Sequence, residues 1–235
     1  MKQIVLGMWV AIALSLSTGT AFAATSKCKY DRTRDKGFVL AENAKGKSVK
    51  GHYLDMFTNQ LVVSTEWADI SHPVRPTGRE MTGFVSALSI GDQSTEYSAK
   101  IEEEHDKFLF LQIEYLRPKK TFPTEDELQN SISVPSGGEL LIGLADGSVV
   151  TLYATNAVTG ETTYETPDPH SGTEFWLMSK ASMNFKLDAG AQTALTATAA
   201  RAVRLITASG DLDIRIHGAG TDNIQKVINC VRGAM

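Results

Sequence analysis

The sequence predicts a mainly β fold of the α+β class, either an antiparallel β-sandwich or a partly open barrel, with two or three covering helices. Three observations favour it. Many segments after residue 51 are rich in β-branched and aromatic residues or alternate apolar with polar ones. An Asp-Gly pair at 146–147 separates two apolar runs, as in a hairpin. Helical signals are few, and the clearest one closes the chain.

The first 23 residues have the features of a secretory signal peptide. Lys2 supplies a positive charge, residues 4–16 are almost wholly apolar, and Ala21-Phe22-Ala23 is a suitable cleavage signal. The apolar run is shorter than the roughly 20 residues that a membrane-spanning helix needs. We therefore expect cleavage after Ala23 and a soluble mature protein, periplasmic or secreted, without a transmembrane segment.

Charge and length narrow the class of protein. The chain carries 23 Lys and Arg against 27 Asp and Glu, a formal charge of -4, and loss of the leader removes only Lys2 among the charged residues. This mild acidity, with no basic cluster interleaved with aromatic residues, argues against a nucleic-acid surface. The mature length suits one large domain with a sizeable core.

The two cysteines, Cys28 and Cys230, lie at opposite ends of the mature chain. An exported protein enters an oxidising compartment, where an even pair most simply forms one disulfide. A redox-active thiol is the alternative, but the sequence contains no Cys-x-x-Cys motif. The bond is expected to tie a polar N-terminal arm, residues 24–50, to a single β-rich domain at 51–235.

The domain is expected to contain a succession of strands joined by loops. Residues 72–80 are a loop with two prolines, and 117–131 are a charged connection in which Thr124 can cap a short helical turn. Residues 155–174 form either an extended hairpin or a long loop. The expected strands are 61–71, 84–90, 94–103, 107–116, the two arms of 139–154, 175–187, 202–207 and 211–217.

Two longer helices are expected in the C-terminal third. Asp188 can cap a helix over 189–200, with Leu195 as its main apolar anchor. Thr221 is expected to cap the final helix, which packs through a stripe at i, i+3, i+4 and i+7. The stripe consists of Ile224, Val227, Ile228 and Val231.

Familiar catalytic motifs are absent from the sequence. There is no Gly-x-Ser-x-Gly elbow, His-Glu-x-x-His pair or P-loop, and the Ser-x-x-Lys match at 26–29 lacks its companion elements. The five histidines have no i, i+4 spacing. The acidic run 102–106 fits a solvated turn guarding a sheet edge better than a Ca²⁺ site. We therefore expect no catalytic residue, metal or cofactor.

The segment 209–230 superficially resembles an active site. Asp211, Asp213 and His217 share the polar face of a strand with Arg215. The arginine disfavours a metal site and can pair with Asp213 or with an acid on a neighbouring strand. Gly218-Ala219-Gly220 precedes the last helix, but Asp222 places a negative charge where a phosphate would bind. This segment is predicted to be structural.

The best candidate for a binding site is the end of the 155–174 segment. Asp168, His170 and Glu174 lie between prolines and a glycine, and Trp176 follows them. Loops on rigid scaffolds often carry binding residues, so these four are expected to contact a protein or small-molecule ligand.

The function expected from these features is a non-catalytic binding role at the cell envelope. The alternatives are an envelope-associated hydrolase, whose site is assembled from distant acids and histidines, and a structural subunit of a surface or secretion assembly. A hydrolase requires a cleft where acids and histidines converge. A binding module requires an exposed aromatic patch, for which Trp67 and Trp176 are the candidates.

Overall fold

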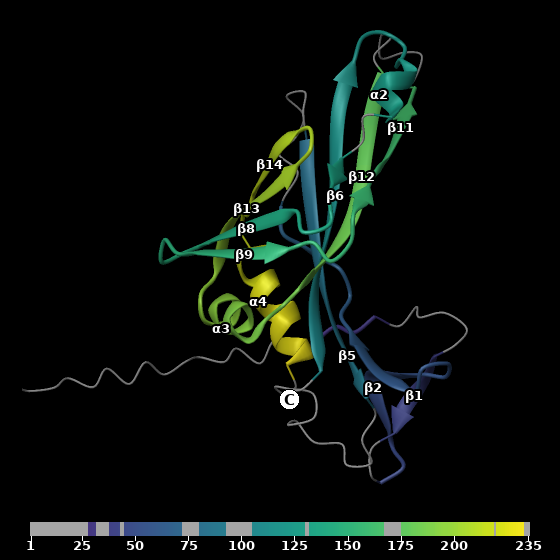
Figure 1. The fold of residues 1–235 in the computed structure, drawn as a ribbon, viewed down its shortest axis with the longest axis vertical. Helices are drawn as coiled ribbons and strands as arrows, with labels where there is room; N and C mark the ends of the chain where they lie inside the picture. The colour runs from purple at the N-terminus through teal and green to yellow at the C-terminus, as the bar shows by residue number, and fades with distance from the viewer. Residues whose placement is uncertain are drawn as a thin grey trace, which may run out of the picture.

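Two antiparallel sheets organise the chain (Figure 1). The computed structural model describes residues 28–31, 38–42, 45–71, 80–92, 105–129, 132–166, 175–218 and 220–232. The predicted leader and the expected strand 94–103 lie outside these residues.

The larger sheet has eight strands in the order β1-β2-β3-β5-β6-β12-β11, with β4 also paired to β5. Its three central strands, β5, β6 and β12, contain 13, 14 and 12 residues and form the long axis of the molecule (Figure 1). The strands are β1 (Phe38–Glu42), β2 (Ser48–Asp55), β3 (Gln60–Ser64), β4 (Ala68–Asp69), β5 (Glu80–Asp92), β6 (Asp106–Lys119), β11 (Glu161–Glu165) and β12 (Phe175–Lys186).

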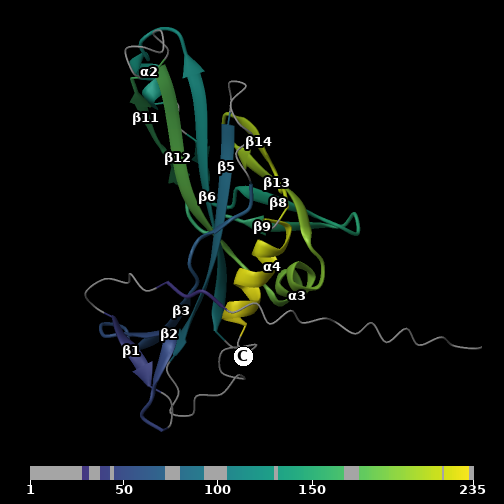
Figure 2. The same cartoon turned by 180° about the vertical axis from the view of Figure 1, so that it is seen from behind.

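The smaller sheet has four strands in the order β14-β13-β8-β9 and packs against one face of the larger one (Figure 2). The Asp-Gly hairpin predicted at 139–154 is present as β8 and β9. The strands of the smaller sheet are β8 (Glu139–Leu144), β9 (Val149–Tyr153), β13 (Ala200–Thr207) and β14 (Gly210–Arg215). A separate two-stranded sheet pairs β7 (Ser133–Val134) with β10 (Val158–Thr159).

Successive side chains of a strand point to opposite faces of its sheet, so each sheet has one apolar face. The core lies between the two sheets, where these apolar faces meet. On the large sheet, Leu111 of β6 lies directly between Val85 of β5 and Met183 of β12. All three are at most 2% exposed. Phe185 is fully buried and forms an isolated β-bridge with Ala154, where the chain leaves the small sheet.

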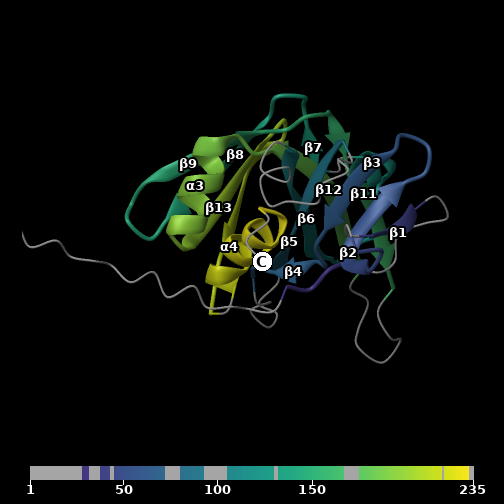
Figure 3. The same cartoon turned by 90° about the horizontal axis from the view of Figure 1, so that it is seen from below.

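Helices α3 (Ala189–Ala197) and α4 (Gly220–Val231) cover one end of this core (Figure 3). Asp188 caps α3 as predicted, accepting from the Ala191 N–H at 2.7 Å, and Leu195 is buried. The helix ends at Ala197 rather than at 200 because Thr198 already has extended backbone.

The start of α4 differs from the prediction. The helix begins at Gly220, so Thr221 lies inside it, and the Thr221 hydroxyl donates to the Gly218 carbonyl at 2.8 Å instead of capping the helix. Gly220 is required by packing, since a Cβ there would lie 2.4 Å from the Ile70 carbonyl oxygen. The predicted apolar stripe of α4 is buried as expected.

The predicted disulfide between Cys28 and Cys230 is present, with a Cα–Cα distance of 5.6 Å. It fastens residues 28–31 to α4, and backbone hydrogen bonds from Asp31 to Ser64 and from Glu66 to Lys29 align them beside β3. Residues 38–42 and 48–50 of the segment expected to be an arm form strands in the large sheet. The division of the chain into arm and domain stays a prediction.

The fold class is therefore confirmed: the chain is mainly β, with antiparallel sheets, no closed barrel in the described part, and helices that include a C-terminal packing helix. Within the described residues, no helix has both the length and the apolar character needed to cross a membrane.

Candidate functional site

The β6, β12 and β11 strands project beyond the smaller sheet and carry the short helix α2 (Glu125–Gln129) at their far end (Figures 1 and 2). We call this end the arm tip, defined by residues 117–129, 161–166 and 175–178. The antiparallel pair β11 and β12 flanks in sequence the segment predicted to bind, of which residues 167–174 lie outside the described part.

Of the four residues predicted for this site, one is described. Trp176 lies near the start of β12, half-buried, and is paired across the hairpin with Glu165. Asp168, His170 and Glu174 lie outside the described residues, so their role as binding residues stays a prediction.

The arm tip carries three aromatic rings in mutual contact, Phe122, Tyr164 and Phe175, which we call the tip cluster. Phe122 meets Tyr164 at 5.0 Å and Phe175 at 5.5 Å between ring centroids, and Tyr164 meets Phe175 at 6.3 Å. All three pairs are edge-to-face, the arrangement that the aromatic quadrupole favours. Phe122 is nevertheless 59% exposed and Tyr164 39% exposed.

Strand register places two of these rings on one face of the sheet. Tyr164 is directly opposite Leu177, and Phe175 lies two residues before Leu177 on the same strand. Because side chains alternate along a strand, Phe175 lies on the sheet face that Leu177, Ala181 and Phe185 present to the core. The tip cluster thus continues the core face beyond the point where the smaller sheet covers it.

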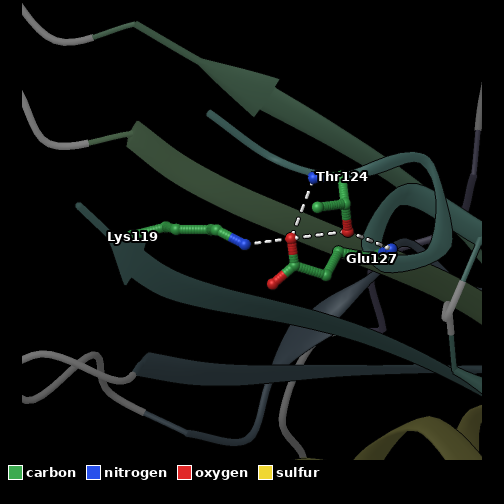
Figure 4. Close-up of polar contacts among 3 residues, drawn as sticks. All are labelled: Lys119, Thr124 and Glu127. Atoms are coloured by element: carbon green, nitrogen blue, oxygen red, sulfur yellow. Dashed lines mark hydrogen bonds and ion pairs between the residues drawn. The ribbon is translucent and has the colours of Figure 1, made fainter. Parts of the chain in front are cut away.

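Phe122 reaches the cluster from the connection between β6 and α2, which a polar network holds in place (Figure 4). Lys119 at the end of β6 donates to the Glu127 carboxylate. The same carboxylate accepts from the N–H and the hydroxyl of Thr124, both at 2.9 Å, and the Thr124 hydroxyl accepts from the Glu127 N–H at 3.4 Å. This reciprocal arrangement is a capping box and confirms Thr124 as the cap of a short helix.

The network also sets the electrostatics of the tip. The hydrogen bond from Lys119, reinforced by those from Thr124, lowers the pKa of Glu127 from about 4.5 to about 2. Glu127 is therefore ionised and paired at neutral pH. Two further acids of the first turn of α2, Glu125 and Asp126, are exposed, as are Glu165 on β11 and Lys120, so exposed acids outnumber exposed lysines at the arm tip.

A second aromatic candidate, Trp67, is 46% exposed and lines a cavity of about 420 Å³ beside the Cys28–Cys230 disulfide. Its walls carry charges of both signs, including Glu66, Asp69 and Lys226. Asn223 of α4 partly closes it by donating to the Asp69 carbonyl at 2.6 Å. Trp67 is the single exposed ring of this cavity among the described residues.

The polar strand face in the last segment is occupied by an ion pair. Arg204 of β13 lies opposite Asp213 and makes two charge-assisted hydrogen bonds to it, at 2.6 and 2.8 Å. This pairing keeps the pKa of Asp213 below its usual range. The partner of Asp213 is thus Arg204 from the neighbouring strand and not Arg215, and the structural role of the face stays a prediction.

The acidic run 102–106 is described only in part. His105 is buried, and Asp106 forms an exposed ion pair with Lys186 at 2.7 Å. Across the residues that the structure describes, no group of three or more His, Cys, Asp or Glu side chains is arranged to hold a metal ion.

Comparison with protein-family models, curated proteins and solved structures found no match for this chain. The assignment of function therefore depends on the geometry of the arm tip. Sequence reasoning named Trp176 of this hairpin but did not name Phe122 or Tyr164. Phe122 is isolated in the charged, proline-containing stretch 117–131, where no periodicity indicates which surface it joins.

Proposed function

We propose that this protein is an exported, non-catalytic binding protein of the cell envelope and that it contacts a protein partner through the tip cluster. The observation that carries the proposal is the exposure of Phe122 and Tyr164 within a packed aromatic group at the projecting end of β6, β11 and β12. The signal-peptide features of residues 1–23 support the proposed location.

Aromatic clusters of this kind suit protein interfaces. Large rings bury much apolar area with few rotatable bonds, and binding energy concentrates in such residues. The capping box and the Lys119–Glu127 pair hold Phe122 in place before any partner arrives. Less conformational entropy is then lost on binding, which favours affinity.

The charges around the cluster indicate the chemistry of the partner. At the arm tip the acids Glu125, Asp126 and Glu165 are exposed, against the exposed Lys120, and Lys119 pairs with Glu127. Complementary potentials accelerate association and select the partner. The surface that fits is an apolar groove or pocket rimmed by Lys or Arg on a folded envelope protein.

The test is affinity capture from envelope extracts with the mature, oxidised protein, followed by identification and purification of the captured protein. Titration of the purified pair is then expected to show that Phe122→Ala weakens binding at least ten-fold, as for an interface hot spot. Phe57→Ala is the matched control, because Phe57 is 85% exposed in the turn between β2 and β3, at the other end of the sheet.

Three results would contradict the proposal. Binding could be equally strong with Phe122→Ala, or could be lost with Trp67→Ala alone, which would transfer the site to the cavity beside the disulfide. A self-associating protein whose oligomer dissolves with Phe122→Ala would favour an assembly subunit. The export component is tested separately by N-terminal sequencing, which is expected to begin at Ala24.

A further inference from the structure

A second cavity lies next to the arm tip, between the core face of strands β6 and β12 and the turn that joins β13 to β14. Its volume is about 310 Å³, and its walls include Tyr115, Arg117, Ile132, Ser179, Asp211 and Leu212. We propose that this cavity, the Arg117 pocket, binds a small organic carboxylate through the Arg117 guanidinium. The proposal does not depend on the proposed protein partner.

Arg117 is held in position by two contacts. Its guanidinium carbon lies 5.2 Å from the centroid of the Tyr115 ring, a cation–π arrangement, and Nη2 donates to the Ser179 hydroxyl at 3.4 Å. Ser179 is 1% exposed and is itself fixed by a 2.9 Å hydrogen bond with Thr162 on β11. Neighbouring strands thus preorganise the guanidinium.

The charge of Arg117 is not neutralised within the described part of the protein. No carboxylate there forms an ion pair with it, and its Nε is buried without an acceptor. A buried donor without a partner is unfavourable, which makes such groups rare unless they serve a function. A guanidinium offers five N–H donors, and one of them is engaged here by Ser179.

The acid on the pocket wall is directed to another arginine. Asp211 lies 3.9 Å from the Arg204 guanidinium on the same small sheet. Arg204 also forms the ion pair with Asp213, so Asp211 and Asp213 share one guanidinium. Arg117 remains the cation that an incoming anion meets in this cavity.

The remaining walls select the ligand. A planar guanidinium pairs best with a carboxylate or a phosphate. Tyr115, Ile132 and Leu212 add apolar surface, which suits the body of an organic acid and offers nothing to a free inorganic ion. The volume is at the lower end of the range of about 300–1,000 Å³ for ligand pockets, so the ligand is small. The carboxylate belongs either to a free small acid or to the C-terminus of a peptide.

The test is calorimetric titration of the mature, oxidised protein with N-acetyl-L-phenylalanine, its carboxamide and inorganic phosphate. The acid is expected to bind saturably and at least ten-fold more tightly than the carboxamide or phosphate. A tripeptide that ends in phenylalanine distinguishes the two sources of the carboxylate. If the tripeptide binds at least as tightly as N-acetyl-L-phenylalanine, the ligand is assigned as a peptide C-terminus. If the tripeptide binds more weakly, the ligand is assigned as a free small acid.

Variants test whether the acid binds in the Arg117 pocket. Arg117→Gln is expected to reduce the affinity for the acid at least ten-fold. Arg117→Lys is expected to reduce it less, because the lysine ammonium keeps the positive charge but cannot form the two parallel hydrogen bonds of a guanidinium. Asp211→Asn is expected to tighten binding by removing a negative charge from the wall. Arg201→Gln, at an exposed arginine of β13 that does not line the pocket, is the matched control.

A second blocking variant covers the case in which Arg117→Gln folds poorly. Ser209 lines the pocket from an exposed turn, so Ser209→Trp obstructs it without changing the core. Phe122→Ala is expected to leave acid binding unchanged, which separates this proposal from the proposed protein partner. Equal binding of acid and carboxamide, no binding of either, or full affinity in Arg117→Gln and Ser209→Trp would overturn the proposal.

Discussion

Lys119, at the last position of β6, donates a hydrogen bond to the carboxylate of Glu127 in α2 and so closes the connection that carries Phe122 (Figure 4). The Thr124 N–H and hydroxyl also donate hydrogen bonds to the same carboxylate oxygen. The shape of the tip cluster therefore depends on one ionised side chain.

The arm tip is expected to lose order in acid. The pKa of Glu127 is about 2 in the folded protein and near 4.5 when the residue is free. A carboxylate with a lowered pKa stabilises the fold fully above its unfolded value, and this contribution is lost as the pH falls from about 4.5 toward 2. Hydrogen exchange of the α2 amides is expected to accelerate through this range.

Two variants test whether protonation of Glu127 causes this loss of order. Glu127→Gln removes the titrating group, so exchange in α2 is expected to be fast at every pH and to lose its acid dependence. Lys119→Met is expected to raise the pKa of Glu127 toward its ordinary value, which a side-chain NMR titration measures directly. Amides of β8, in the core of the smaller sheet, serve as the internal reference. Acid sensitivity of α2 that persists in Glu127→Gln would assign the effect to another group.

The disulfide is expected to be a major contribution to stability. Cys28 and Cys230 are separated by 202 residues, and the loss of a native disulfide typically lowers the free energy of unfolding by about 2–5 kcal/mol. Chemical denaturation of the Cys28→Ser, Cys230→Ser double variant against the oxidised protein measures this difference. The reduced wild-type chain should unfold at the same denaturant concentration as the variant. Two reactive thiols in the denatured, unreduced protein would contradict the bond itself.

Local patterns in the sequence were sufficient for most elements of the fold. Alternation predicted the strand at 107–116, of which Leu109, Leu111 and Ile113 are buried as expected. The Asp146-Gly147 turn predicted the β8–β9 hairpin, and Asp188 predicted the start of α3. Each of these signals arises within a few residues, where backbone geometry and side-chain spacing are directly linked.

The relationships that join distant segments were not predictable in this way. Phe122 and Phe175 meet because β6 pairs with β12 in a register that places Phe175 opposite Lys119. Arg204 pairs with Asp213 because β13 and β14 bring them directly opposite, and the spacing within one strand did not indicate this partner. Register is set by the whole sheet, so one strand read alone does not reveal it.

Truncation of Phe185 is expected to destabilise the junction between the two sheets. Its side chain is fully buried, and its backbone pairs with Ala154 where the chain crosses from the smaller sheet. Phe185→Ala is expected to lower the free energy of unfolding by about 3–5 kcal/mol through lost burial and the cavity left behind. The neighbouring Tyr153 is 56% exposed, so Tyr153→Ala is the control and should change stability by about 0.5 kcal/mol or less. Equal effects of the two variants would refute the assigned position of the core.

The Gly-x-Gly turn before α4 is a packing device, and a pair of glycine variants tests this. The N–H of Gly220 donates to the His217 carbonyl at 3.0 Å and that of Thr221 to the Gly218 carbonyl at 3.3 Å, so these amides are engaged within the turn rather than directed at an anion. A Cβ at Gly220 would lie 2.4 Å from the backbone oxygen of Ile70, which cannot withdraw as a flexible side chain would.

Gly220→Ala is therefore expected to lower the free energy of unfolding by about 1–3 kcal/mol, as overpacking does. The opposing gain in helix propensity from glycine to alanine is at most about 1 kcal/mol, so the close approach dominates. Gly143→Ala in β8 is the control, because the nearest atoms to its Cβ are 3.9 Å away and its backbone is not left-handed. Denaturant unfolding is expected to leave this variant as stable as the wild type or slightly more stable. A stabilised Gly220→Ala would instead mean that α4 starts farther from Ile70 and that the glycine is needed for another reason.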